Sequence, residues 1–240
     1  MAPVLFISDL HLSADRPGAN RLFFDFLEQR ATGASALYIL GDLFEYWAGD
    51  DDCDDPFNNS VIDALAGLAG HGVATYFMAG NRDFLAGGDF SRRAGLTILP
   101  DPTTISLFGI PTLLMHGDTL CIDDHEYMAF RTHIRSARWT SEFLSKPLQE
   151  RKAIIGGLRR QSEDLKRGKD PAIMDVNTFS VDSALAANGY PRLIHGHTHR
   201  PMRHEHRIDG HSCERWVLAD WYEHGGVLVC DATGCRLETV

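Results

Sequence analysis

The chain has 240 residues, a formal net charge of −10, and a balance of 44% hydrophobic and 23% charged residues. This length suits one well-packed domain, or one domain with a modest insertion. The negative charge argues against a protein that binds nucleic acid over its whole surface. No apolar run reaches the roughly eighteen residues of a membrane span. The opening residues Met1–Asp9 lack the basic start of a signal peptide, and we expect a strand there instead.

Short apolar runs and helically spaced apolar residues alternate along the first half of the chain. The expected strands and helices are, in chain order, a strand over Val4–Ser8, a helix over Asn20–Arg30, a strand over Ala36–Leu40, a loop over Asp50–Asp55, a helix over Val61–Leu68, a strand over Val73–Ala79, and two strands over Thr104–Phe108 and Pro111–Met115. Further strands are expected over Arg192–Ile194, Trp216–Ala219 and Gly226–Val229. This alternation predicts an α/β fold with mixed sheets.

The pattern changes in the middle of the chain, where strand signals vanish. Apolar residues such as Phe143, Ile154 and Leu158 recur there at near-helical spacing, with basic residues between them. From Arg131 to Asp170 there are eleven Lys or Arg and five Asp or Glu, so this stretch carries +6 and the remainder −16. We interpret residues 121–176 as a helical cap inserted into a core of residues 1–120 and 177–240. Its basic face is expected to meet an anionic partner, although a solvated helical face is the alternative.

The five cysteines are an odd number and lack the paired spacing of a zinc site. They are Cys53, Cys121, Cys213, Cys230 and Cys235. We expect reduced thiols in a cytoplasmic protein.

Polar motifs follow the ends of five predicted strands. They are Asp9-Leu10-His11, Gly41-Asp42, Gly80-Asn81-Arg82-Asp83, His116-Gly117-Asp118 and Gly196-His197-Thr198-His199. In open α/β sheets, ligands bind at that edge because the loops leaving neighbouring strands converge there. Each motif alone occurs by chance, but the recurrence of carboxylates, one amide and imidazoles at five strand ends predicts a shared metal site. Imidazole with carboxylate suits Mn, Fe, Zn or Co better than Mg or Ca.

In order and spacing, these motifs resemble those of the calcineurin-like metallophosphoesterase superfamily. The likeness is greatest to its family of UDP-2,3-diacylglucosamine diphosphatases, which act in bacterial lipid A synthesis. It rests on the stretches Ile7–Leu12, Tyr38–Asp42, Gly80–Leu85, Leu114–Asp118, Ile173–Val176 and Leu193–Pro201. The resemblance implies a four-layer α/β-β-α sandwich with a helical cap insertion.

The resemblance also implies two Mn²⁺ ions per subunit, bridged by Asp42. The implied ligands are Asp9, His11, Asp42 and His199 for one ion, and Asp42, Asn81, His116 and His197 for the other. The implied catalytic residues are Asp42, Asn81, Arg82, His116 and His197. His195 is not expected to be a ligand, and Asp83 and Asp118 are expected to accept hydrogen bonds that orient the ligands.

The implied reaction is hydrolysis of the diphosphate of UDP-2,3-diacylglucosamine to UMP and 2,3-diacylglucosamine 1-phosphate, by metal-activated hydroxide. Arg82 supports a phosphoanhydride substrate from its own chemistry, since many superfamily members have His there. Arginine cannot give up its proton, but it can clamp phosphate oxygens. A phosphate leaving group, with a second pKa of about 6, departs without a general acid. The alternative is that Arg82 forms a structural ion pair, for example with Asp83 or Asp118.

A cap with apolar and basic faces can hold both acyl chains and a diphosphate. The expected substrate contacts are Asn81, Arg82, Asp124, Tyr127, Arg159, Ser162, Lys166, Lys169 and His197. Those in the cap depend on an ungapped match through a variable region.

The expected partner is an acylated UDP-sugar, with no nucleic acid and no obligate protein partner. A lipid substrate implies peripheral contact of a cytoplasmic protein with the cytoplasmic face of the inner membrane. One alternative is another two-metal phosphodiesterase or nucleotide-sugar diphosphatase of the same superfamily. A non-catalytic scaffold on this fold is a third hypothesis, disfavoured because all seven implied ligands are present.

Overall fold

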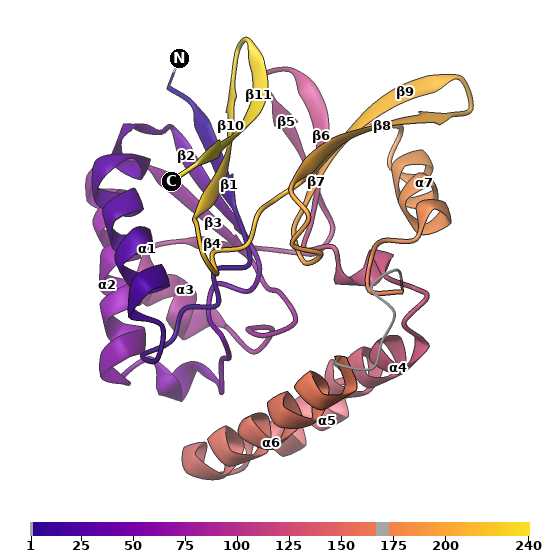
Figure 1. Ribbon diagram of the computed structural model, residues 1–240. Helices are drawn as coiled ribbons and strands as arrows, with labels where there is room; N and C mark the ends of the chain where they lie inside the picture. The colour runs from indigo at the N-terminus through magenta and orange to yellow at the C-terminus, as the bar shows by residue number, and fades with distance from the viewer. Residues whose placement is uncertain (1, 167–172) are drawn as a thin grey trace.

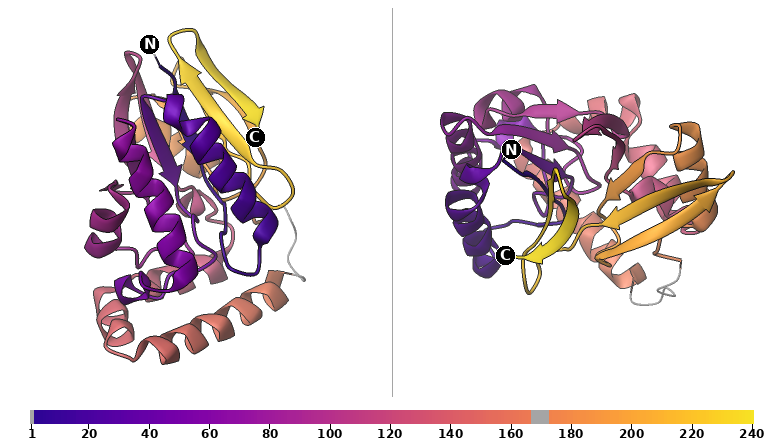
Figure 2. Two further views of the ribbon diagram at one scale, coloured as in Figure 1. Left: turned by 90° about the vertical axis from the view of Figure 1, so that its left-hand side faces the viewer. Right: turned by 90° about the horizontal axis from the view of Figure 1, so that it is seen from above.

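The computed structural model describes residues 2–166 and 173–240, and the side chains of all of these except residues 161–166. Two sheets lie against each other, with helices on both outer faces (Figure 1). A further group of helices lies apart from these layers, at one end of both sheets (Figures 1 and 2). This end is where the functional side chains gather.

The first sheet has the strand order β11-β10-β1-β2-β3-β4. β1, β2, β3 and β4 are parallel, and β10 and β11 join antiparallel to β1. The strands are β1 (Val4–Ile7), β2 (Ala36–Leu40), β3 (Ala74–Met78), β4 (Thr97–Leu99), β10 (Gly226–Asp231) and β11 (Gly234–Thr239). The helices α1 (Pro17–Gln29), α2 (Pro56–Gly70) and α3 (Gly88–Ala94) cover its outer face, where Phe23, Leu65 and Phe90 join Leu5 and Leu37 in one buried cluster.

The second sheet has the order β5-β6-β7-β9-β8. Its strands are β5 (Thr103–Leu107), β6 (Ile110–Met115), β7 (Arg192–His195), β8 (Met202–Ile208) and β9 (His211–Val217). The helix α7 (Thr178–Ala187) packs Val181 and Leu185 on its outer face. Between the sheets, Phe6 and Leu40 from one meet Leu114 and Ile194 from the other. The layers are therefore α, β, β, α, and the predicted sandwich is confirmed.

The five strands predicted in the first half of the chain are present, and no strand end differs from its predicted position by more than one residue. Both predicted helices begin earlier than expected, because a proline at the first helical position starts each one. The predicted Asp50–Asp55 loop contains a short 3₁₀ turn, and Asp55 caps α2 by accepting from the backbone N–H groups of Phe57 and Asn58.

The expectation of five free thiols is wrong for two cysteines. Cys230 and Cys235 lie opposite each other across the β10–β11 hairpin and form a disulfide. The hairpin register brings them together, which their spacing alone does not predict. Cys53, Cys121 and Cys213 are free and buried.

The helices α4 (His125–Ile134), α5 (Ala137–Leu144) and α6 (Leu148–Lys166) form the separate group, which we call the cap. They fall within residues 121–176, and the domain bounds themselves stay a prediction. Several ion pairs and hydrogen bonds attach the cap to the core, and two of its arginines illustrate them. Arg151 bonds to the carbonyl of Ala48 and to Asp51, while Arg131 Nε donates to Asp118 Oδ2 at 2.6 Å. Over the residues that the structure describes, no helix is long and apolar enough to cross a membrane.

Arg151 is 2% exposed although it carries a charge, so its contacts hold α6 against the core. We expect Arg151→Met to lower the free energy of unfolding by about 1–3 kcal/mol, because it leaves the Ala48 carbonyl without its donor. Urea denaturation measures this change. Arg138→Met, at a residue exposed on the same cap, is the matched control and should shift stability by less than about 0.5 kcal/mol. Equal stability of the two variants would show that Arg151 does not anchor the cap.

Candidate active site

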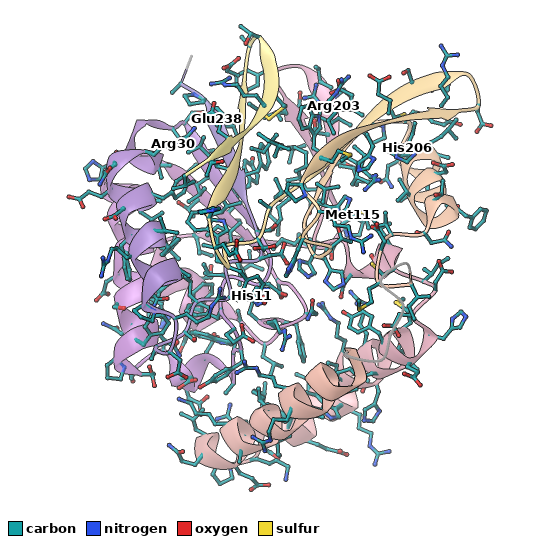
Figure 3. All side chains as sticks on the ribbon, viewed as in Figure 1. His11, Arg30, Met115, Arg203, His206 and Glu238 are labelled. Carbon is teal, nitrogen blue, oxygen red and sulfur yellow. A yellow bond between two sulfur atoms is a disulfide. The ribbon has the colours of Figure 1, made fainter. Side chains whose placement is uncertain are left out.

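Loops from both sheets meet at the sheet end that faces the cap, where Figure 3 shows His11. Asp9 and His11 follow β1, Asp42 follows β2 and Asn81 follows β3. From the second sheet, His116 follows β6, and His197 and His199 follow β7. Each of the predicted ligands therefore leaves the carboxyl end of its strand, as the sequence pattern indicated.

The side chains of these residues converge on one locus. Asp42 lies between two imidazoles, with Oδ2 3.7 Å from His11 Nε2 and Oδ1 3.8 Å from His116 Nε2. His116 Nε2 is also 3.1 Å from Asn81 Oδ1, and His199 Nε2 is 3.2 Å from Asp9 Oδ1. Oxygen and nitrogen atoms of Asp9, His11 and His199, and of Asp9, Asp42 and His116, lie within 4.8 Å of one another in each set. His197 adjoins the second set, with its ring centroid 5.1 Å from that of His116.

The backbone at this locus adopts a conformation that side chains rarely allow. Five of the predicted ligands have positive φ angles: Asp9 (55°), His11 (51°), Asp42 (54°), His197 (68°) and His199 (55°). Such left-handed residues cost free energy and persist only where the surrounding structure imposes them. Their concentration here indicates that the loops are shaped to aim these side chains at one point.

The motif glycines pack the loops closely around these side chains. A Cβ on Gly80 would meet the carboxylate of Asp42, and one on Gly196 would meet the carboxylate of Asp9 and the hydroxyl of Ser8. The glycines of these motifs are therefore required by close approach of backbone to the acidic groups.

Outer partners orient the histidine rings. The Nδ1 of His116 lies 2.9 Å from the carbonyl of Leu40, which directs its Nε2 inward. The Nδ1 of His11 lies 3.3 Å from Glu45 Oε2, and that of His199 lies 3.5 Å from Asp220 Oδ2. Metal-ligating histidines have such partners on their second nitrogen.

The residues present fit divalent cations. His11 is 2% exposed, yet among the described residues neither ring nitrogen makes a hydrogen bond, although Nδ1 lies 3.3 Å from Glu45 Oε2. A buried imidazole nitrogen without a partner costs free energy unless something binds it. Four imidazoles, two carboxylates and an amide suit a transition metal better than Mg²⁺ or Ca²⁺.

Charge at the site is strongly perturbed in the metal-free protein. Burial alone would lower the pKa of His116, but the carboxylates of Asp42 and Asp118 raise it to about 9. Burial, with His116 nearby, lowers the pKa of His197 to about 4. Burial opposes ionisation of Asp9, but its hydrogen bond with His199 and the neighbouring imidazoles hold the pKa of this carboxyl well below its usual range. The hydrogen bond with Asp9 and the charge of this carboxylate also raise the pKa of His199 against the effect of burial.

This arrangement predicts a pH-dependent metal affinity. A ligating imidazole must be neutral, so at neutral pH a bound cation displaces the proton of His116. The apparent association constant for Mn²⁺ should rise about tenfold or more per pH unit below pH 9, with at least about one proton released per protein. Titration calorimetry between about pH 6 and 8, in buffers of different ionisation enthalpy, measures both quantities. An affinity that does not change with pH would contradict the assignment of His116 as a ligand.

The expected outer acceptors are in place, but with other donors than predicted. Asp83 accepts from backbone N–H groups of Gly80, Asp42 and Leu43, and so fixes two ligand loops rather than a ligand side chain. Burial and the nearby Asp42 raise its pKa to about 6. Asp118 accepts from Tyr127 and Arg131, which ties the core to the cap. His195 points away from the ligands, as expected, between the Gly196 carbonyl and Arg215.

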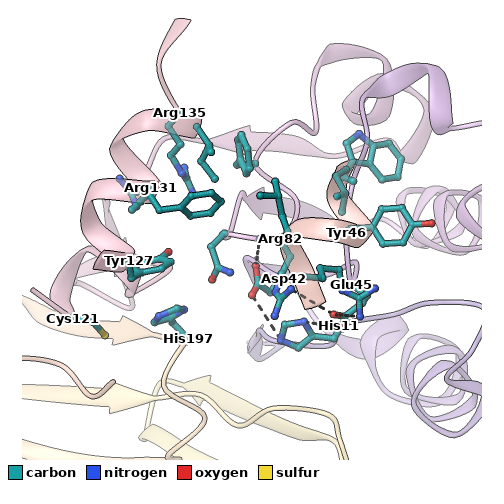
Figure 4. Close-up of a pocket in the computed structure, with 18 of the residues that line it drawn as sticks. His11, Asp42, Glu45, Tyr46, Arg82, Cys121, Tyr127, Arg131, Arg135 and His197 are labelled. Carbon is teal, nitrogen blue, oxygen red and sulfur yellow. Dashed lines mark hydrogen bonds and ion pairs between the residues drawn. The ribbon is translucent and has the colours of Figure 1, made fainter. Parts of the chain in front are cut away.

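Arg82 forms an ion pair, as the structural alternative expected, but its partner is Glu45 rather than Asp83 or Asp118. Its Nη1 lies 3.7 Å from Glu45 Oε1, because the loop turns its side chain toward His11 and the cavity (Figure 4). Its backbone N–H donates to Asp42 Oδ1 at 2.8 Å. Arg82 is thus fixed beside the predicted bridging carboxylate.

A cavity of about 520 Å³ lies between the sheet ends and the cap. Its polar lining from the core includes His11, Asp42, Asn81, Arg82 and His197. Its apolar lining comes mainly from the cap and the loop after β3: Phe84, Leu85, Phe130, Ile134, Trp139, Phe143, Ile155 and Leu158. One cavity is therefore lined by the predicted metal locus and by many apolar side chains, with charged cap residues such as Arg131 and Arg135 among them.

Several predicted cap contacts also line this cavity. Asp124, which caps α4 through the N–H of Tyr127, lies there with Tyr127 and Arg159. Ser162 and Lys166 belong to α6, but their side chains fall outside the described part of the chain. Lys169 lies outside the described residues altogether.

Sequence reasoning missed several side chains at this site, among them Glu45 and Tyr222. The Tyr222 ring stacks on His11 at 5.4 Å between centroids, and Arg16 lies 4.3 Å from its centre. Glu45 had one available signal: it is a single charge within the otherwise apolar and aromatic run Leu43–Trp47.

Comparison with known proteins agrees with this geometry. The family model described as calcineurin-like phosphoesterase matches residues 2–201, and the chain belongs to that family. Within it, the chain is 56% identical to a UDP-2,3-diacylglucosamine hydrolase of Aromatoleum aromaticum, over 96% of this chain and 94% of that one. Proteins of the same name from Cellvibrio japonicus and Xanthomonas campestris are 48% and 50% identical, covering 97% and 98% of this chain and 97% of each relative. The chain is a hydrolase of the phosphoesterase type, and the hypothesis of a non-catalytic scaffold is wrong.

Proposed function

We propose that this enzyme hydrolyses the diphosphate of UDP-2,3-diacylglucosamine to UMP and 2,3-diacylglucosamine 1-phosphate, a step of lipid A synthesis. The observation that carries the proposal is one cavity lined both by the predicted metal ligands and by a large set of apolar side chains from the cap and the loop after β3. A lipid-bearing nucleotide sugar needs both in one place. The relatives that are 48–56% identical to this chain are named UDP-2,3-diacylglucosamine hydrolase, which supports the choice of substrate.

The seven side chains of the predicted metal locus would hold two Mn²⁺ ions, with Asp42 between them. A bound pair of this kind lowers the pKa of water and neutralises charge on phosphoryl oxygens. Asn81, His116 and His197 would hold one ion, and Asp9, His11 and His199 the other. The Leu40 carbonyl, Glu45 and Asp220 keep the rings of His116, His11 and His199 aimed at this locus.

Two arginines support a phosphoanhydride, rather than a phosphate ester with an alkoxide leaving group, as the substrate. The backbone N–H of Arg82 bonds to Asp42, and the side chains of Arg82 and of Arg159 from α6 both contact Glu45. Both remain charged throughout, so they can hold phosphoryl oxygens but cannot protonate an alkoxide. The phosphate group released from a diphosphate needs no such proton.

The apolar lining of the cavity would hold the acyl chains. Its aromatic side chains come from the loop after β3 and from the cap, and burial of hydrocarbon there contributes roughly 0.8 kcal/mol per methylene. Asp124, Tyr127, Ser162, Lys166 and Lys169 remain proposed contacts with the polar part of the substrate. A substrate with two acyl chains implies peripheral contact with the cytoplasmic face of the inner membrane.

The test compares acylated and non-acylated UDP-sugars. UMP release from UDP-2,3-diacylglucosamine should require Mn²⁺ and exceed release from UDP-N-acetylglucosamine by far more than tenfold in kcat/KM. No turnover with metal present would overturn the proposal. Equal efficiency with both substrates would favour a nucleotide-sugar diphosphatase without lipid specificity.

A further inference from the structure

Glu45 is a buried carboxylate that contacts both the predicted metal locus and the cap. It lies in the loop after β2, and its side chain is 9% exposed. One oxygen, Oε2, is 3.3 Å from His11 Nδ1. The other, Oε1, is 2.8 Å from Arg159 Nη2 and 3.7 Å from Arg82 Nη1. A single side chain therefore touches a predicted ligand and both cavity arginines (Figure 4 shows Glu45 with His11 and Arg82).

The charges of this cluster do not cancel. Two guanidinium groups face one carboxylate, which leaves one positive charge beside the predicted metal locus. Arg159 lines the cavity, and its buried Nε has no hydrogen-bond partner among the residues that the structure describes. The pair of arginines is thus held in place by Glu45 but not neutralised by it, which suits a site that receives an anion.

The main effect of the Glu45 contacts is to fix the two arginine side chains in place before a substrate binds. A free arginine side chain loses up to about 2 kcal/mol of rotamer freedom when it is fixed, and a carboxylate that fixes it beforehand removes this cost from the reaction. Donors that are already aimed at a developing charge stabilise a transition state more than donors that must reorganise.

We propose that Glu45 is a positioning residue that orients His11 and holds Arg82 and Arg159 together as a preorganised clamp for a phosphoryl group. The proposal rests on the proposed function for its natural substrate. Through its ion pair with Arg159, Glu45 also holds α6 close to the predicted metal locus. The same residue therefore attaches the cap and orients the groups proposed to act on the substrate. No other described carboxylate is paired with both arginines.

This role predicts a split between kcat and KM. Loss of the carboxylate charge frees both arginines, which lowers kcat. It also removes negative charge near an anionic substrate, so KM should stay the same or fall. A residue that only maintained the fold would not separate the two constants in this way.

The experiment measures kcat and KM of Glu45→Gln, Glu45→Asp and the matched control Glu150→Gln at saturating Mn²⁺. Glu150 pairs with Lys146 on the exposed face of the cap. We expect Glu45→Gln to lower kcat by tenfold or more without raising KM, and to weaken Mn²⁺ binding about 10–100-fold. Glu45→Asp keeps the charge and should recover part of kcat, and Glu150→Gln should match the unmodified enzyme.

Coupling to Arg159 sharpens the test. If Glu45 acts through this arginine, the double variant Glu45→Gln/Arg159→Gln should lose less kcat than the product of the two single losses. Unchanged kcat in Glu45→Gln, a higher KM at unchanged kcat, or fully independent effects of the two substitutions would overturn the proposal. If Glu45→Gln does not fold by circular dichroism, the same criteria apply to Glu45→Asp.

The generic diester bis(p-nitrophenyl) phosphate separates this proposal from the proposed function. Hydrolysis of the diester but not of the acylated UDP-sugar would show that the proposed substrate is wrong. Glu45 would then be judged on kcat and KM for the diester and on Mn²⁺ titration. Turnover of the acylated substrate by the unmodified enzyme and by Glu45→Gln at the same kcat would reject the positioning role alone.

Discussion

Replacing Asp42 with asparagine is expected to lower turnover of the acylated UDP-sugar by about 10³-fold or more. Asp42 lies between His11 and His116, within 3.8 Å of an imidazole nitrogen on each side. Asp9 belongs to both sets of ligand groups, but Asp42 has an imidazole nitrogen against each of its two oxygens. Asparagine has nearly the same shape, and its amide oxygen can still accept from the N–H of Arg82, so the loop should keep its conformation. The substitution removes the charge that two neighbouring cations require between them.

Metal content and kcat of Asp42→Asn, measured together, check this expectation. Fewer than two Mn²⁺ per chain should accompany the loss of turnover. Asp89→Asn is the matched control, since Asp89 is an exposed carboxylate paired with Arg92 on α3. Near-normal turnover by Asp42→Asn would contradict a bridging role.

The second large effect is expected for Arg82→His, which should retain Mn²⁺ but lower diphosphate turnover by about 10²-fold. Histidine can occupy the loop, because the Arg82 backbone rather than its side chain bonds to Asp42. It loses the permanent charge and the forked donors that clamp phosphoryl oxygens. Activity on a substrate with an alkoxide leaving group should fall less, because an imidazolium can supply a proton.

A second substitution, Arg82→Lys, separates the effect of the positive charge from the effect of the forked guanidinium group. Arg82→Lys keeps the charge without the fork and should fall between the unmodified enzyme and Arg82→His. Unchanged UMP release by Arg82→His would remove the argument from the leaving group, although the metal locus would stand.

The parts predicted well from sequence are those with a strong local signal. β1 and β2 are apolar runs buried on both faces, and each ends in a polar motif, so their place and their edge of the sheet follow from the chain itself. The same signal is weak in β8, whose exposed, charged residues Met202–Ile208 form an edge strand. α7 is short, and its alanines mark no clear apolar face, so it was not predicted.

The parts that could not be predicted depend on contacts between distant segments. Glu45 resembles any surface glutamate until the fold brings Arg82 and Arg159 to it. The positive φ angles at Asp9 and His199 have no sequence signal, because residues other than glycine rarely adopt them. The Cys230–Cys235 disulfide likewise follows from hairpin register.

Product identification tests the central claim most directly. UDP-2,3-diacylglucosamine is incubated with the enzyme, with and without Mn²⁺, and the products are resolved by ³¹P nuclear magnetic resonance. Cleavage of the anhydride predicts equal amounts of UMP and 2,3-diacylglucosamine 1-phosphate, and neither product in the presence of a metal chelator. Release of UDP, or products that form equally with the chelator present, would contradict a metal-dependent hydrolase of the diphosphate bond.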